Sequence, residues 1–160
     1  MKDNKEFGKL TSIEDYWKKL NWEFEMLKNN SDNIYYAFNF VITAFHLLDW
    51  AEPQPRGTTN QNRQIIKKNI KYLKVCEQLA NGAKHFEIDP KRHNSVESMK
   101  SEEYVEDGYV EEGYTEDPII ITLSEQEKIS ILELANSLML DWKNVLKTKK
   151  NDKHLKFPSI

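Results

Sequence analysis

The sequence is poor in the residues that mark several common classes of protein. A single cysteine, Cys76, excludes an intrachain disulfide framework and a cysteine-based zinc site. Only five glycines and five prolines occur in 160 residues, which favours a helical globular domain over a β-sandwich or a disordered chain. The formal net charge of −3 gives no overall attraction to nucleic acid or anionic lipid. Glycine-rich phosphate loops, nucleotide fingerprints and serine-hydrolase elbows are also absent from the sequence.

A hydrophobic segment of the kind that spans a membrane is also lacking. The longest apolar run, Ile34 to Trp50, contains Asn, Thr, His and Asp and is shorter than the ~20 apolar residues of a transmembrane helix. The N-terminal sequence MKDNKEFGKL is charged and lacks the apolar core of a signal peptide. We therefore expect a cytoplasmic protein without membrane contact, formed as one domain over residues 1–160.

Apolar residues recur at helical spacing in four stretches, which predicts a mainly α protein. The predicted helices run from a capping box at Thr11–Glu14 to about Lys28, from Ser31 to Glu52, from about Gln61 to Lys84, and from a second capping box at Ser124–Glu127 to Lys147. Four helices joined mostly by short loops predict an up-and-down four-helix bundle. Residues 148–160 are basic and aperiodic, which predicts a loose tail.

The segment from about 95 to 122 loses the helical spacing and predicts a small β-hairpin insert between the third and fourth helices. Asp107-Gly108 is a two-residue hairpin signal that places Val105 opposite Val110. Pro118–Thr122 predicts a short strand that pairs within Val96–Val110. The insert also carries carboxylates, namely Glu102, Glu103, Glu106, Asp107, Glu111, Glu112, Glu116 and Asp117. We expect them to mimic nucleic acid or to bind a basic partner. A segment that lies over the chain's own basic helix and tail, or that is merely solvated, has the same pattern.

Four polar residues interrupt the apolar second helix: Asn39, Thr43, His46 and Asp49. At 100° per residue they form one stripe along the helix. A helix that is apolar on most sides is normally surrounded by protein, so its polar groups need partners. His46 and Asp49 are three residues apart, so the carboxylate can accept an imidazole N–H and fix a general base or ligand. The alternative is a hydrogen-bonded core network without chemistry.

A second polar group lies at the end of the third helix, where Asn81, Lys84 and His85 emerge together. The sequence Asn81-Gly-Ala-Lys84-His85 resembles the second half of the motif of the HEPN superfamily of small helical bundles. HEPN members that cut RNA carry an Arg, a polar residue, three further residues and a His, and the Arg position is Ala80 here. Without the guanidinium, no obvious group neutralises the scissile phosphate.

The resemblance implies a helical bundle and a homodimer, because HEPN members catalyse in a cleft between two copies. The chain also resembles a group of small uncharacterised bacterial and mobile-element proteins with the order HLxDW, ANxxKHF, variable insert and a final helix with Trp. These motifs are His46–Trp50, Ala80–Phe86 and Asp141-Trp142 here. This likeness implies that Asn39, Thr43, His46 and Asp49 face Asn81, Lys84 and His85 in one buried pocket.

Three functional hypotheses follow. The leading one is a dimeric, non-catalytic HEPN-like protein that binds a protein or RNA partner, in phage or mobile-element conflict. The first alternative is a metal-independent ribonuclease with His85 as general base and Lys84, Asn81 or His46 around the phosphate. The second alternative is an inhibitor that acts through the acidic insert. His93 and His154 fall in predicted loops, so no metal site is predicted, and no cofactor is expected.

Overall fold

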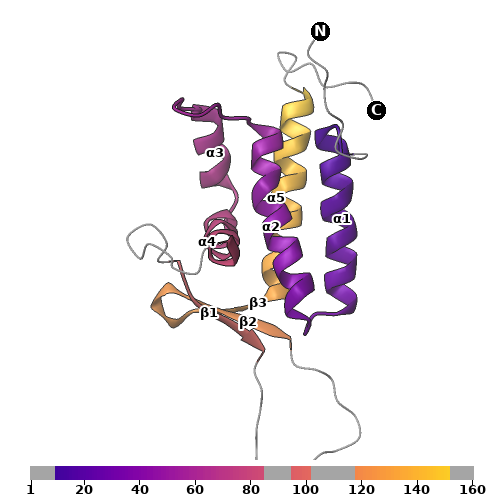
Figure 1. The fold of residues 1–160 in the computed structure, drawn as a ribbon, viewed down its shortest axis with the longest axis vertical. Coiled ribbons are helices and arrows are strands. Elements are labelled where there is room, and N and C mark those ends of the chain that lie inside the picture. The colour runs from indigo at the N-terminus through magenta and orange to yellow at the C-terminus, as the bar shows by residue number, and fades with distance from the viewer. Residues whose placement is uncertain (1–9, 85–94, 102–117, 152–160) are drawn as a thin grey trace, which may run out of the picture.

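The fold is mainly α-helical with a small antiparallel sheet at one end (Figure 1). The computed structural model describes residues 10–84, 95–101 and 118–151. These ranges contain five α-helices and three strands. The predicted class and the β element are therefore confirmed, whereas the up-and-down four-helix bundle is not.

The first two helices form the predicted antiparallel hairpin. Helix α1 covers Ile13–Asn29 and α2 covers Ile34–Ala51. Ser12, one residue after the predicted cap, accepts a hydrogen bond from the backbone N–H of Asp15 (3.1 Å). The Asp15 carboxylate in turn accepts from the Ser12 hydroxyl (2.9 Å) and from the Thr11 N–H (3.3 Å), and these two hydrogen bonds lower the pKa of Asp15. Glu52 ends α2 as expected, immediately before Pro53.

The predicted third helix is wrong as a single element, because it breaks into α3 (Gln61–Asn69) and α4 (Leu73–Lys84). Ile70 is buried and has an extended backbone (φ −95°, ψ 108°). The N–H of Lys71 would bond within an unbroken helix, but here it donates to Asp141 Oδ2 (3.1 Å). Figure 1 shows α3 upright and α4 nearly end-on, so the break turns the chain sharply.

Three strands form the sheet in the order β1-β2-β3, all antiparallel. They cover Val96–Ser101, Ile119–Leu123 and Lys128–Ser130. The predicted strand around Pro118–Thr122 is confirmed, since Met99 pairs with Ile121. Gln78 of α4 fixes β1 to the helices, because its amide accepts from the Ser95 N–H (2.7 Å) and donates to the Val96 carbonyl (2.8 Å).

The last helix, α5, covers Ile131–Asn151, so it begins later than the predicted capping box. Ser124–Gln126 form a short 3₁₀ turn, in which Glu125 and Gln126 have left-handed φ values of 71° and 66°. The turn leads into β3, and the true capping box is Ser130 with Glu133. The Ser130 N–H donates to the Glu133 carboxylate (3.0 Å), and the Glu133 N–H donates to the Ser130 hydroxyl (3.1 Å). These bonds from Ser130 lower the pKa of Glu133.

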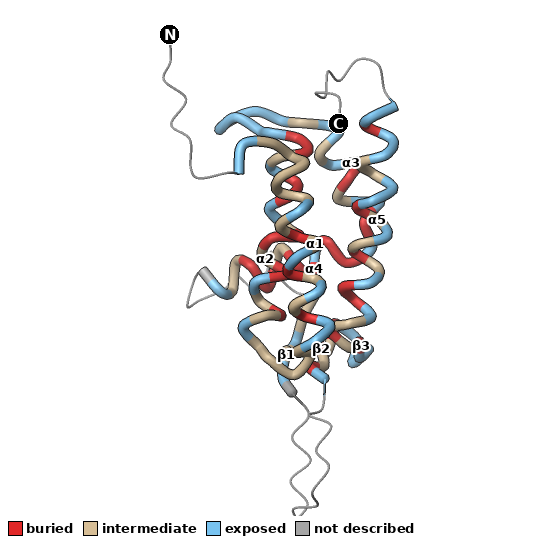
Figure 2. The backbone as a smooth tube through the Cα atoms, turned by 90° about the vertical axis from the view of Figure 1, so that its right-hand side faces the viewer, coloured by how far each residue is buried: buried red, intermediate tan, exposed pale blue. Residues whose placement is uncertain are grey.

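The core lies where α1, α2, α4 and α5 meet above the sheet. Buried residues, red in Figure 2, recur at intervals along α5, as expected for an amphipathic helix. Trp142 of α5 is fully buried, and its indole N–H donates to the Ala44 carbonyl of α2 (3.0 Å). Within the described ranges, none of the helices has the length and apolar character needed to cross a bilayer.

Candidate functional site

The predicted polar stripe of α2 is divided between the inside and the outside of the protein. Thr43 is buried, whereas Asn39, His46 and Asp49 are exposed. The expectation of a buried stripe is therefore wrong for these three residues. The opposite side of α2 is uniformly apolar and fills the core with Phe40, Val41, Ala44, Leu47 and Leu48. Burial of that side turns most of the polar stripe toward solvent.

Thr43 belongs to a polar network between α1 and α2. Lys19 donates to Thr43 Oγ1 and forms an ion pair with Glu23, which is 6% exposed. Glu23 Oε2 has no hydrogen-bond partner among the described residues. Tyr16 lies beside this network and stacks on Trp50, with ring centroids 5.2 Å apart. Burial, reinforced by the Glu23 charge, raises the pKa of Tyr16. The network joins the two helices.

Asp49 pairs with an arginine rather than with His46. The Arg63 guanidinium of α3 contacts Asp49 Oδ1 at 2.7 Å. Its other terminal nitrogen donates to the carbonyls of Leu48 (3.3 Å) and Glu52 (3.1 Å). These carbonyls belong to the last turn of α2 and its cap, where a cation is favourable. Arg63 therefore closes the end of α2, and Asp49 orients it.

A buried ion pair that the sequence reasoning missed lies next to this cap. Lys149 and Glu52 are 7% and 8% exposed, and their side chains form a salt bridge between α5 and the end of α2. Asn60 donates to the other Glu52 oxygen (3.1 Å). The pair lines a cleft of about 380 Å³ between α3 and α5. The prediction of a loose tail from 148 is thus wrong for residues 148–151, which are helical.

The second predicted cluster lies only partly within the described residues. Asn81 is half-buried in the last turns of α4, and Ala80, the position of the family arginine, is 7% exposed. The side chain of Lys84 and the whole of His85 lie outside the described residues, as does the acidic surface from Glu102 to Asp117. One pocket shared by His46 and His85 therefore stays a prediction.

The exposed side of α2 forms a surface of aromatic and apolar residues. We define the outward face of α2 by its exposed and half-buried residues at spacings of three and four: Tyr35, Phe38, Asn39, Ile42, Phe45, His46 and Asp49. Tyr35 is 77% exposed. In Figure 1, α1 flanks α2 on one side, α3 and α4 lie on the other, and α5 lies behind it. No described helix covers this face.

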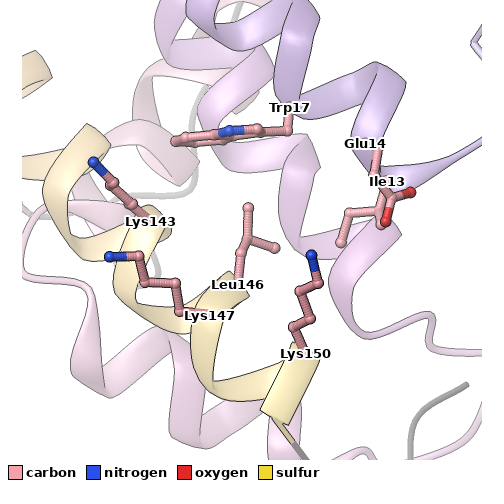
Figure 3. A pocket seen from close by; sticks show the side chains of 7 residues that line it. All are labelled: Ile13, Glu14, Trp17, Lys143, Leu146, Lys147 and Lys150. Carbon is pink, nitrogen blue, oxygen red and sulfur yellow. The ribbon is translucent and has the colours of Figure 1, made fainter. Parts of the chain in front are cut away.

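An apolar pocket lies between α1 and α5. Figure 3 shows Trp17 and Leu146 in its walls and lysines of α5 around it. The described residues thus offer two surfaces for recognition and tie most of their buried polar groups into structural contacts. Comparisons of the chain with protein-family models, curated proteins and solved structures find no match.

Proposed function

We propose that this protein is a HEPN-like homodimer without catalytic activity, which acts by binding and dimerises through the outward face of α2. The observation that carries the proposal is that this face presents an exposed Tyr35 and half-buried Phe38, Ile42 and Phe45 with no described helix over them. Monomeric proteins rarely expose a contiguous apolar patch without a role. Aromatic residues are also enriched where protein interfaces are buried.

The outward face is complementary to itself when two copies of α2 pack antiparallel. With a two-fold axis at Ile42, each residue lies opposite the one equally far on the other side. Tyr35 then lies opposite Asp49, and Phe38 lies opposite His46. A phenol hydroxyl can donate to a carboxylate, and an aromatic ring can stack on an imidazole. Isologous pairing therefore joins unlike groups.

The size of the face requires help from its neighbours. From Tyr35 to Asp49 it is about 21 Å long, at 1.5 Å per residue, and a helix is about 10 Å wide. This is well below the ~800 Å² that a standard interface buries on each partner. The flanking helices α1 and α4 contribute the remainder in this proposal, with Ile42 at the centre.

The absence of catalysis is supported by the surroundings of the predicted groups. Ala80 occupies the arginine position of the HEPN motif and is buried, so the chain supplies no guanidinium there. Asp49, the predicted partner of His46, forms its ion pair with Arg63. Among the described residues, His46 therefore lacks the carboxylate that would fix its tautomer as a general base.

Sedimentation velocity and an RNA cleavage assay test the two parts of the proposal. We expect a dimer for the wild type and a monomer for Ile42→Lys, which places two charges opposite each other at the axis. Tyr35→Ala alters an exposed side chain and should weaken the dimer without loss of folding. Leu140→Lys, at a 61% exposed position of α5, is the matched control and should remain dimeric. A monomeric wild type, or RNA cleavage that disappears in His85→Ala, would overturn the proposal.

A further inference from the structure

The pocket between α1 and α5 combines an apolar interior with a cationic rim. Ile13, Trp17 and Leu146 form its apolar walls, and its volume is about 190 Å³. Figure 3 shows the Trp17 ring along one wall, with Leu146 below it and Ile13 opposite. An apolar cavity of ~150 Å³ is large enough to bind benzene. The pocket therefore accommodates one aromatic ring.

Three lysines of α5 surround the pocket at Lys143, Lys147 and Lys150. None of them forms an ion pair with another described residue, and all three are exposed. In Figure 3 the Lys150 ammonium points toward Ile13, while those of Lys143 and Lys147 point to the other side. Among the described residues that line the pocket, Glu14 is the only one with a carboxylate. This charge pattern favours an aromatic group attached to several negative charges.

The chain contains a segment with that chemistry in residues 102–117, which lie outside the described part. Its sequence repeats a tyrosine every five residues, at Tyr104, Tyr109 and Tyr114, and acidic residues follow each tyrosine at the second and third positions. In an extended peptide these carboxylates lie about 7–10 Å from the tyrosine. The lysines are spaced about 6 and 10 Å along α5 from Lys143, at 1.5 Å per residue. The row of three lysines is therefore about as long as the reach from the tyrosine to its carboxylates.

We propose that the pocket binds a tyrosine of the acidic segment 102–117 from a second copy of the chain, with the following carboxylates over the lysines of α5. This inference rests on the homodimer proposed above. Figure 1 shows the sheet and the N-terminal end of α1, which lines the pocket, at opposite ends of the molecule. An antiparallel pairing through α2 reverses the second copy, so in this proposal its sheet lies toward the pocket end of the first copy. By symmetry, the two copies make the same contact twice.

The reach of the segment favours the second copy over the same chain. The pocket lies about 22 Å along α5 from Ile131, which follows the sheet. Tyr104 lies three residues after Ser101, so a fully extended chain carries it at most about 10 Å from the sheet. Tyr114 lies four residues before Pro118, which limits its distance from the sheet to about 13 Å. Of the three tyrosines, only Tyr109 has a maximum reach, about 27 Å, that exceeds the distance to the pocket of its own chain. This requires that the segments on both sides of Tyr109 are almost fully extended.

Photo-crosslinking of the full chain tests the contact. Tyr109 is replaced by the photoreactive residue benzoylphenylalanine, and ¹⁵N-labelled and unlabelled copies are mixed so that mass spectrometry separates crosslinks between copies from those within one. We expect crosslinks between copies at residues 13–17 or 143–150. Reversing the rim charges in Lys143→Glu/Lys147→Glu/Lys150→Glu should lower their yield about tenfold, which corresponds to the loss of several exposed ion pairs.

Crosslinks within one copy, crosslinks at other positions, or an unchanged yield in the triple variant would overturn the inference. Lys68→Glu, an exposed position on α3, is the control for a change of charge alone. Sedimentation of the same samples separates the two proposals. A dimer without pocket crosslinks contradicts only the contact of the acidic segment, whereas a monomer contradicts the dimer itself.

Discussion

Replacement of Lys149 by methionine should strongly destabilise the protein. Lys149→Met keeps the apolar stem and removes the ammonium from a pair whose side chains are only 9% and 11% exposed. Removal of one partner from a buried pair typically costs about 3–5 kcal/mol, because the remaining charge is buried alone. Asn60 still donates to Glu52, so we expect the lower end, about 3 kcal/mol. Such a loss is a large part of the ~5–15 kcal/mol that stabilises a typical domain.

Urea unfolding, followed by far-UV circular dichroism at fixed protein concentration, measures this loss. In Glu52→Leu/Lys149→Met both charges are absent, and the free energy of unfolding should return to within about 1 kcal/mol of the wild type. Lys68→Met changes an exposed lysine of α3 and should cost less than about 0.5 kcal/mol. A loss below about 1 kcal/mol in Lys149→Met, or an equal loss in the double variant, would refute the reasoning.

Three further predictions concern the core, a helix cap and the cysteine. Trp142→Phe should lower the free energy of unfolding by about 1–3 kcal/mol, because it removes the indole hydrogen bond and leaves a cavity. In the same urea titration, Trp22→Phe at a 62% exposed position should be nearly neutral. Because Ser130 lowers the pKa of Glu133 from its ordinary 4.5, this interaction stabilises the fold above pH 4.5 and is lost as the pH falls further. The stability difference between wild type and Glu133→Gln should therefore shrink between pH 5 and pH 3, and an unchanged difference would contradict the cap. Burial raises the pKa of Cys76, so the thiol should react with Ellman's reagent only when the protein unfolds, and rapid reaction of the native protein would disprove its burial.

The elements that the sequence predicts best are those in which local signals and burial agree. Helices α1 and α2 have apolar periodicity and clear ends, and both were confirmed, with ends within three residues of the predicted ones. The strand at Ile119–Leu123 is a β-branched run after a proline, and it also formed as predicted. In these segments the tertiary structure reinforces the local preference.

The helix predictions were wrong where contacts with distant residues determine which of two local structures forms. Residues 61–84 have continuous apolar residues at helical spacing, yet the helix breaks at Ile70. The N–H of Lys71 that the break leaves free donates to Asp141, which lies seventy positions after Lys71. Two Ser-x-x-Glu patterns precede α5, and only the one at Ser130 caps it. The one at Ser124 forms a hairpin turn because the strand pairing of Leu123 continues to Glu127.

The site residues were harder to predict, because periodicity gives the spacing of a stripe but not its direction. Asn39, Thr43, His46 and Asp49 lie on one side of α2, yet only Thr43 is buried. Lys149 belongs to a basic stretch that resembles a solvated tail, and its burial depends on Glu52 nearly a hundred residues earlier. One sequence signal was available, since Lys149 continues the helical spacing of Trp142, Val145 and Leu146.

Disulfide trapping at Ile42 tests the central claim most directly. In Ile42→Cys the two new thiols would face each other across the two-fold axis, and Cα atoms about 5.5–6 Å apart can be bridged. The native Cys76 is fully buried and does not compete. We expect mild oxidation to convert Ile42→Cys into a covalent dimer, while Leu140→Cys stays monomeric on a non-reducing gel. Equal trapping of the two variants, or none in Ile42→Cys, would contradict dimerisation through the outward face of α2.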